Sequence, residues 1–361
     1  MHTRTLTKPD GRALRLYSRR PISETIESPP AAPEGAPANS HMRWHPLRRE
    51  WVAYAGHRQG RTFLPPAEHN PLAPSDDPHR PSELPVGDYD VAVFDNLFPT
   101  FSATATAQPP EIVDTRPANG ACEVVVFTQD PSQSLGRLPL SQIELILEVW
   151  GERYADLGKR EDVRYVMPFE NRGVEVGVTL HHPHGQIYAY PFVPPIPAGE
   201  LSAQLAYKRA NGCGLLERLL ADEVTDGRRL LYVSDLAIAI VPVCARYAYE
   251  VWIAPRRAAQ SFADLHAEER AEIARALKTI LLKFDRLWDQ AFPYVMVVHQ
   301  APCDGQDHPE AHVHIEFYPP YRMRGRLKYI AGSELGAGAF TADTLPEAKA
   351  EELRAVEVDI D

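Results

Sequence analysis

Hydrophobic positions recur in two successive blocks of the chain, each with one long helix among several strands. In the first block, apolar residues at helical spacing predict a helix over residues 141–157. Alternating apolar positions predict strands at residues 90–94, 123–128, 164–169, 174–180 and 185–193. In the second block, the helix is expected over residues 264–288, with strands at residues 230–233, 237–243, 249–253, 294–300 and 312–318. Helices inserted between runs of strands favour an α+β fold with largely antiparallel sheets.

Short motifs of the first block recur in the second. Each recurs about 130 residues further along the chain, so the spacing between the copies is almost constant. The matching motifs are Glu123-Val124 with Glu250-Val251, Tyr165-Val166-Met167 with Tyr294-Val295-Met296, and His182-x-His184 with His312-x-His314. Three matches in register predict a duplicated unit of helix and antiparallel sheet.

Composition and the repeat divide the chain into an N-terminal arm and two halves. Residues 1–40 are rich in proline and alanine, and we expect them to pack on another surface as an extension and not to form a core element. The first half covers residues 41–195 and the second covers residues 196–361. Proline is frequent throughout, with 34 residues in a chain of 361, which favours extended and turning segments.

Charge and composition exclude several classes of function. With 38 Lys and Arg against 49 Asp and Glu, the net charge of −11 argues against a nucleic-acid or anionic-membrane binder, although a local cationic pocket is compatible with it. The most apolar stretch, residues 230–255, is interrupted by Asp235, Arg246 and Glu250, so no membrane span is expected. The four cysteines form no Cys-x-x-Cys pair, and residues 1–30 contain no signal-peptide core. We therefore expect a cytoplasmic protein.

Half of the 14 histidines lie in two short segments. The first segment contains His181, His182 and His184, and the second contains His299, His308, His312 and His314. Imidazole is a common metal ligand and titrates near neutral pH. Two histidine clusters at matching places of a repeat therefore favour a catalytic or metal-binding role over a role in packing alone.

The first cluster continues as His182-Pro183-His184-Gly185-Gln186. In an extended chain, His182, His184 and Gln186 face the same side. Pro183 cannot donate a ladder hydrogen bond, which predicts a strand entrance or edge, and Gly185 allows close backbone approach. A neutral imidazole can attack phosphorus, and the Gln186 amide can donate a hydrogen bond to a phosphoryl oxygen. This pattern predicts phosphoryl chemistry without a Gly-x-x-x-x-Gly-Lys phosphate loop, which the chain lacks.

At this segment, the sequence resembles the galactose-1-phosphate uridylyltransferase family of the histidine-triad superfamily. The motif is followed by Ile187-Tyr188-Ala189-Tyr190-Pro191-Phe192, which fits the same family. Further similar segments lie at residues 43–47, 51–58, 94–99, 169–173, 312–320 and 331–335. The resemblance spans residues 43–355 and implies a duplicated histidine-triad-like fold.

The resemblance implies a double displacement. His184 would attack the α-phosphorus of UDP-glucose, release glucose 1-phosphate and hold the uridylyl group, which galactose 1-phosphate then accepts. The implied catalytic residues are His184, Gln186 and His182. The implied substrate contacts are Arg58 and Arg61 at the nucleotide and phosphate, Asn96, Asn171 and Thr179 at the nucleotide, and Lys328, Tyr329 and Glu334 at the hexose phosphate. A homodimer whose sites use residues of both chains is also implied.

The second histidine cluster is typical of a metal site. His312 and His314 face one side of a predicted strand, and His299 ends the neighbouring one. Three imidazoles and one carboxylate suit zinc or iron. The resemblance supplies Glu200 as the carboxylate, so we expect one divalent metal, with a structural role, on Glu200, His299, His312 and His314.

The chain also departs from the family pattern. Many members carry a further zinc on a Cys-x-x-Cys pair, a later histidine and the first histidine of His-Pro-His. Asn70-Pro71-Leu72-Ala73 and Pro131 occupy those places here. We therefore expect no second structural zinc, and expect His182 to be hydrogen-bonded near His184. Ser333 and residues 336–338 also differ from the family pattern, near the residues implied to contact the hexose phosphate. The sequence therefore does not determine the acceptor sugar or the base of the nucleotide.

Three alternatives remain from the sequence. The chain could be a related phosphorylase or transferase acting on ADP-sugars or other nucleoside-diphosphate sugars. It could be a catalytically silent nucleotide-binding module. It could also be a metal-dependent hydrolase or oxygenase centred on His299, His312 and His314.

Overall fold

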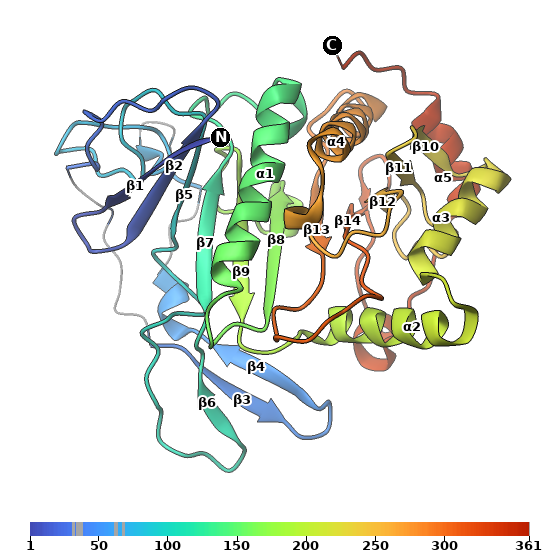
Figure 1. The fold of residues 1–361 in the computed structure, drawn as a ribbon, viewed down its shortest axis with the longest axis horizontal. Helices are drawn as coiled ribbons and strands as arrows, with labels where there is room; N and C mark the ends of the chain where they lie inside the picture. The colour runs from blue at the N-terminus through green and yellow to red at the C-terminus, as the bar shows by residue number, and fades with distance from the viewer. Residues whose placement is uncertain (31–32, 34–38, 61–63, 67–68, 361) are drawn as a thin grey trace.

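The computed structural model describes residues 1–30, 33, 39–60, 64–66 and 69–360. Among these residues, eleven strands form one antiparallel sheet in the order β1-β2-β5-β7-β9-β8-β13-β14-β12-β11-β10 (Figure 1). The N-terminal stretch contributes β1 (His2–Thr7) and β2 (Ala13–Ser18), and the strands of the first half are β5 (Val91–Asp95), β7 (Ala121–Val126), β8 (Tyr165–Arg172) and β9 (His184–Tyr190). Those of the second half are β10 (Leu230–Val233), β11 (Ala237–Ile240), β12 (Val251–Pro255), β13 (Tyr294–His299) and β14 (His314–Tyr318).

The two halves of the chain meet at the centre of this sheet. β8 and β13 pair there, with Phe169 opposite Val297. Outward from this pair, the first half runs β9, β7, β5 and the second runs β14, β12, β11, all antiparallel. The corresponding helices, α1 (Leu140–Leu157) and α4 (Ala267–Leu287), contact each other. The prediction of a duplicated α+β unit with antiparallel sheets is confirmed.

One face of the sheet is buried under α1 and α4. Helix α1 forms where predicted, because Ile143, Ile146, Leu147 and Trp150 recur on one side and are fully or almost fully buried. These side chains pack in one cluster with Ile187 and with residues of α4. Burial of this shared apolar surface holds the two halves together.

The other face is covered by smaller elements. Helices α2 (Pro195–Asn211) and α3 (Leu215–Asp226) belong to the second half, where α3 packs Leu216 and Leu220 on the sheet. The first half adds a three-stranded sheet of β3 (His41–His45), β4 (Glu50–Tyr54) and β6 (Thr115–Pro117). The hairpin of β15 (Tyr321–Met323) and β16 (Arg326–Leu327) comes later in the chain. The C-terminal helix α5 (Pro346–Arg354) packs Ala350 and Leu353 in the same cluster as α1 and α4.

Two expectations from the sequence are wrong. The N-terminal stretch was expected to lack core elements, but β1 and β2 form a hairpin that extends the main sheet through β2 and β5, and Leu14 and Leu16 are fully buried. The prolines that follow obscured the alternation of residues 13–18; residues 31–32 and 34–38 lie outside the described part. The strand expected at 174–180 is a single 3₁₀ turn, Val174–Val176, because Gly173 and Gly177 adopt positive φ angles of 98° and 79°.

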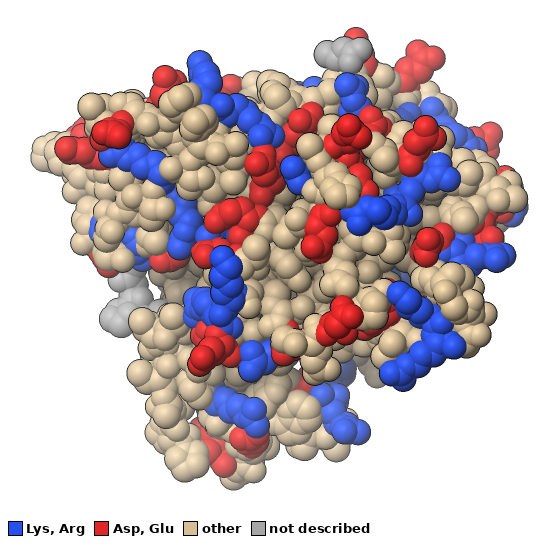
Figure 2. All heavy atoms as spheres, viewed as in Figure 1, with Lys and Arg blue, Asp and Glu red and all other residues tan. Residues whose placement is uncertain are grey.

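Figure 2 shows Lys and Arg side chains interspersed with Asp and Glu over the viewed face. No broad basic surface is present on this face, in keeping with the net negative charge. Within the described residues, no helix is both long and apolar enough to cross a bilayer.

Candidate active site

The His-Pro-His-Gly-Gln segment leads into β9 at the centre of the first half. His184 begins the strand, and the burial pattern alternates along it, so His184 and Gln186 point away from the helices while Gly185 and Ile187 point toward them. A Cβ on Gly185 would lie 2.8 Å from Phe127 Cζ and 2.9 Å from the Phe169 carbonyl oxygen. Only glycine fits there without displacing these neighbours.

The ring of His184 is held in one orientation. Its Nδ1–H donates to the carbonyl oxygen of His182 at 2.7 Å, so in the neutral ring Nε2 carries the lone pair. Burial lowers the pKa of His184, although the bond to His182 opposes this effect. The ring is therefore neutral at neutral pH, the form in which imidazole is a nucleophile.

His182 is buried and hydrogen-bonded on both sides of its ring. Nε2 lies 2.7 Å from the carbonyl oxygen of Thr128, and Nδ1 lies 3.0 Å from Nδ2 of Asn70. Burial also lowers the pKa of His182. Asn70 was recognised from the sequence only as a departure from a zinc site. No local pattern indicated that its amide would reach His182.

A small cavity of about 120 Å³ opens beside His184 and Gln186. It also contains three of the residues implied to contact the nucleotide, Arg58, Asn96 and Thr179. Its apolar wall includes Leu72, Phe94, Phe98 and Val124. Apolar walls with a few polar groups suit a nucleobase and its ribose. The structure therefore brings these predicted residues together; Arg61 lies outside the described residues.

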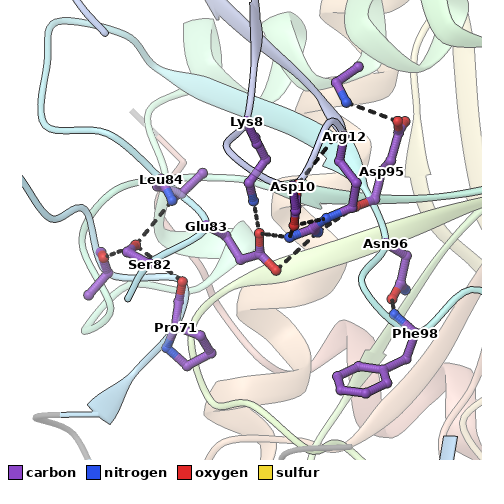
Figure 3. A network of polar contacts seen from close by, with 12 residues as sticks. Lys8, Asp10, Arg12, Pro71, Ser82, Glu83, Leu84, Asp95, Asn96 and Phe98 are labelled. Carbon is purple, nitrogen blue, oxygen red and sulfur yellow. Dashed lines mark hydrogen bonds and ion pairs between the residues drawn. The ribbon is translucent and has the colours of Figure 1, made fainter. Parts of the chain in front are cut away.

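Arg58 and Asn96 are fixed by the segment that follows β5. Nη1 of Arg58 donates to the Phe98 carbonyl at 3.0 Å, to Thr100 Oγ1 at 2.8 Å and to the Tyr188 hydroxyl at 3.0 Å. Asn96 Oδ1 accepts the N–H of Phe98 at 2.8 Å (Figure 3). These bonds hold a guanidinium and a carboxamide at the cavity edge.

The same cavity has a charged wall that the sequence did not reveal. Glu83 lines it, and the turn of the N-terminal hairpin brings Lys8 and Arg12 onto the Glu83 carboxylate (Figure 3). Arg12 donates to both Glu83 oxygens, at 3.2 and 2.9 Å, and to the carbonyl oxygen of Asp95 at 2.8 Å. The side chain of Lys8 is fully buried. The hairpin thus supports the cavity.

A larger cavity of about 830 Å³ borders His184 and His182 from another side. Asn171 lies in this large cavity and not in the small one. Its cationic residues include Arg137 and Arg172, and Arg172 is paired with Asp285 at 2.7 and 3.1 Å. His184 is therefore accessible from two cavities.

The residues implied to contact the hexose phosphate lie elsewhere in the chain. Neither cavity beside His184 is lined by Lys328, Tyr329 or Glu334. Lys328 Nζ lies 3.4 Å from Glu334 Oε1, and the side chain of Tyr329 is 77% exposed. Within one chain, the structure does not bring these three residues to His184.

A candidate metal cluster lies on the same face of the sheet, in the second half. Glu200 of α2, His299 of β13 and His314 and Glu316 of β14 have ligand atoms within 4.8 Å of one another. His299 and His314 are cross-strand partners, and His299 Nδ1 lies 2.8 Å from Glu200 Oε2. Glu316 was not predicted, although its place two residues after His314 puts it on the same face.

His312 is adjacent to this group but not among its four members. Its Nε2 lies 2.8 Å from the carbonyl oxygen of Pro255, and its buried Nδ1 has no hydrogen-bond partner among the described residues. Nδ1 of His299 is also buried, and it faces the carboxylate of Glu200. Both residues line a small pocket shared with Glu200 and His314. The atoms are thus suited to a cation.

A duplicated unit that carries a His-x-His strand in each half, with a neutral imidazole facing two cavities in the first, defines a protein of the histidine-triad class. Residues 31–194 match the N-terminal domain of galactose-1-phosphate uridyl transferase, and residues 200–360 match its C-terminal domain. The chain therefore belongs to the galactose-1-phosphate uridylyltransferase family.

Individual relatives are similar over nearly the whole chain. The galactose-1-phosphate uridylyltransferase of Thermotoga maritima is 37% identical and covers 88% of this chain and 99% of its own. That of Streptomyces lividans is 32% identical over 96% of both chains. A solved structure of a uridylyltransferase matches with a TM-score of 0.79 and 34% identity, over 87% of this chain and 98% of its own. An ADP-glucose phosphorylase from Arabidopsis thaliana, at 22% identity and a TM-score of 0.67 over 89% of this chain and 100% of its own, shares the fold.

Proposed function

We propose that this chain moves a uridylyl group from UDP-glucose to galactose 1-phosphate by double displacement through His184. The observation that carries the proposal is a neutral imidazole, fixed through Nδ1–H, that borders both a small apolar cavity with polar residues and a large cavity. The names of the similar proteins support the same substrates.

The positions of the side chains support the following reaction. In the first half-reaction, the lone pair on Nε2 of His184 attacks the α-phosphorus, and the bond from phosphorus to the bridging oxygen breaks. Glucose 1-phosphate leaves with that bonding pair. Gln186 lies two residues along the same strand face and donates an amide hydrogen bond to the phosphoryl oxygen. Galactose 1-phosphate then attacks the phosphorus and displaces the imidazole.

Covalent labelling tests this function. Incubation with UDP-glucose labelled in the α-phosphate, without acceptor, should give acid-labile and base-stable label on the protein. Addition of galactose 1-phosphate should transfer the label to UDP-galactose. The same assay with an ADP-sugar determines the base. If UDP-glucose leaves no label on the protein, the proposal is wrong, and label from ADP-sugars alone would assign the chain to a different base.

We also propose that Glu200, His299, His312 and His314 hold one divalent metal, zinc or iron. The buried Nδ1 of His312, which has no hydrogen-bond partner among the described residues, supports this, because an uncompensated nitrogen lone pair is costly in a protein interior. Burial lowers the pKa of His314, but the carboxylates of Glu316 and Glu200 raise it to about 9, so the cluster favours a positive charge. The metal would join α2 to β13 and β14 and would supply structural stability.

Removal of the metal is therefore expected to lower stability and leave the chemistry of His184 intact. Binding at 1,000-fold excess over Kd stabilises by about 4 kcal/mol, which corresponds to roughly 5 °C in Tm for a chain of this length. His314→Ala should lose the metal by elemental analysis and show this shift. His308→Ala, whose ring pairs with Asp304 and Glu310, is the matched control. If brief chelation stops labelling of a folded protein, the metal is not merely structural.

A homodimer in the cytoplasm completes the proposal, with the boundary between the halves near residue 195. The exposed position of Tyr329, away from His184, supports a site to which Lys328, Tyr329 and Glu334 of a second copy contribute. The four cysteines are free, which supports a reducing compartment.

A further inference from the structure

The two His-x-His segments are copies of each other in their hydrogen bonds. In the first half, Nε2 of His182 contacts the Thr128 carbonyl, and the carbonyl of His182 accepts Nδ1–H of His184. In the second half, Nε2 of His312 contacts the Pro255 carbonyl at 2.8 Å, and the carbonyl of His312 accepts Nδ1–H of His314 at 2.9 Å. The same scaffold therefore presents both second histidines.

The copies differ at Nδ1 of the first histidine. Nδ1 of His312 is buried without a hydrogen bond and lies beside the candidate metal cluster. Nδ1 of His182 faces the carboxamide of Asn70 at 3.0 Å. The Nδ1 atom that has no partner in the second half therefore contacts an amide group in the first half, which contains His184.

The neighbouring bonds determine which atoms donate. The Thr128 carbonyl can only accept, so Nε2 of His182 carries the proton and Nδ1 is an acceptor in the neutral ring. Asn70 Oδ1 accepts the N–H of Leu72 at 3.0 Å, which directs Nδ2 of Asn70 toward His182 as the donor. Each polar group in this chain of bonds has a partner of the opposite kind.

The loop that carries Asn70 is held by backbone contacts. The hydroxyl of Ser82 contacts the carbonyls of Pro71 and Ala73 at 3.2 and 2.6 Å, and the N–H of Glu83 donates to the Pro71 carbonyl at 2.8 Å (Figure 3). Ser82 and Glu83 are buried. These bonds hold the loop at Pro71 and Ala73, and none of them reaches the side chain of Asn70 or of His182.

We propose that Asn70 is a positioning residue for the reaction of His184. Its amide keeps His182 neutral and in one tautomer, so that the carbonyl of His182 stays in place and orients Nδ1–H of His184, with Nε2 toward the substrate. This inference rests on the proposed function. It states that the amide of Asn70 holds the His182-Pro183-His184 segment in place.

Two substitutions remove this donor in different ways. Asn70→Ala leaves Nδ1 of His182 without a partner. Asn70→Asp keeps the size of the side chain but presents a carboxylate, which favours a protonated Nδ1. Since small errors in the position of reacting groups cost up to about 100-fold in rate, we expect the rate of label formation to fall roughly 10-fold to 100-fold. The KM for UDP-glucose should change little, because Asn70 does not line the small cavity.

The matched control is Ser82→Ala, which weakens the same loop without touching His182. It should lower Tm and keep the labelling rate near that of the wild type. ¹⁵N NMR of histidine-labelled protein, with the His182 signals assigned by their loss in His182→Gln, gives a readout independent of activity. The wild type should show Nε2 protonated and Nδ1 bare, and Asn70→Asp should show both nitrogens protonated.

The possible outcomes separate this inference from the proposed function. Wild-type labelling rates in both Asn70 variants, or an equal loss in Ser82→Ala, would overturn the role of Asn70 while the proposed function stands. A wild type that takes no label would overturn the proposed function, and the role of Asn70 in catalysis with it. A slow Asn70→Ala with a normal KM, together with the altered His182 tautomer in Asn70→Asp, would support the inference.

Discussion

His184→Ala is expected to take no covalent label from UDP-glucose and to lose turnover on the order of 10⁶-fold, the loss typical when a covalent nucleophile is removed. The reason is structural, because the imidazole of His184 is the one that borders both cavities with its Nδ1–H engaged. The fold should survive, since His184 is only partly buried. Labelling and circular dichroism on the same preparation check both points.

His2→Ala is the matched control for this prediction. His2 is exposed and lines neither cavity beside His184, so its loss should leave labelling intact. The pH dependence gives a second check. Because burial lowers the pKa of His184, the neutral ring persists below the usual imidazole range, and the labelling rate should fall only at pH values under about 6.5. Persistent label on His184→Ala, or its loss in His2→Ala, would contradict the assignment.

The parts of the fold that were predictable are those with a local signal. The helical spacing of Ile143, Ile146 and Trp150 predicted α1 to within a residue of its start. The motif pairs predicted a duplication because each pair marks the same strand in the two halves, such as β9 and β14. The His-Pro-His-Gly-Gln pattern gave the face on which His184 and Gln186 lie.

The parts that were missed depend on contacts between distant segments. Nothing local in residues 8–12 indicates that Lys8 and Arg12 would meet Glu83. The hydrogen bond from Asn70 to His182 joins residues 112 positions apart. Such pairings are set by the packing of whole elements, so they become visible only in three dimensions.

The candidate metal cluster contains residues that the sequence predicted and one residue that it did not. His299, His314 and Glu200 come together as expected, since cross-strand pairing in β13 and β14 places the two rings side by side. Glu316 corresponds in the repeat to Gln186, two residues after the second histidine of the motif. The amide of Gln186 suits a phosphoryl group in the first half, and the carboxylate of Glu316 suits a cation in the second half.

The second large effect is expected at Glu83. Glu83→Ala should destabilise the protein by about 3–5 kcal/mol, the usual cost of leaving a buried charge without its partner. Glu83 has a side-chain exposure of 6%, and its partners Lys8 and Arg12 have 0% and 14%. Nζ of Lys8 also lies 4.6 Å from the centre of the Phe94 ring, in an apolar setting that cannot solvate it. Chemical denaturation measures the loss.

The matched control for Glu83→Ala is Glu148→Ala, which also removes one carboxylate that is paired with the N-terminal hairpin. The pair of Glu148 with Arg19 is partly exposed, so its loss should cost less than about 1 kcal/mol. Lys8→Met in the Glu83→Ala background removes a buried amine whose pKa burial lowers to about 6, and it should recover part of the stability by replacing an unpaired polar group with an apolar one. If this double variant is less stable than Glu83→Ala alone, the buried ion pair does not hold the hairpin.

Because Glu83 lines the small cavity, the KM for UDP-glucose should rise in Glu83→Ala and stay unchanged in Glu148→Ala.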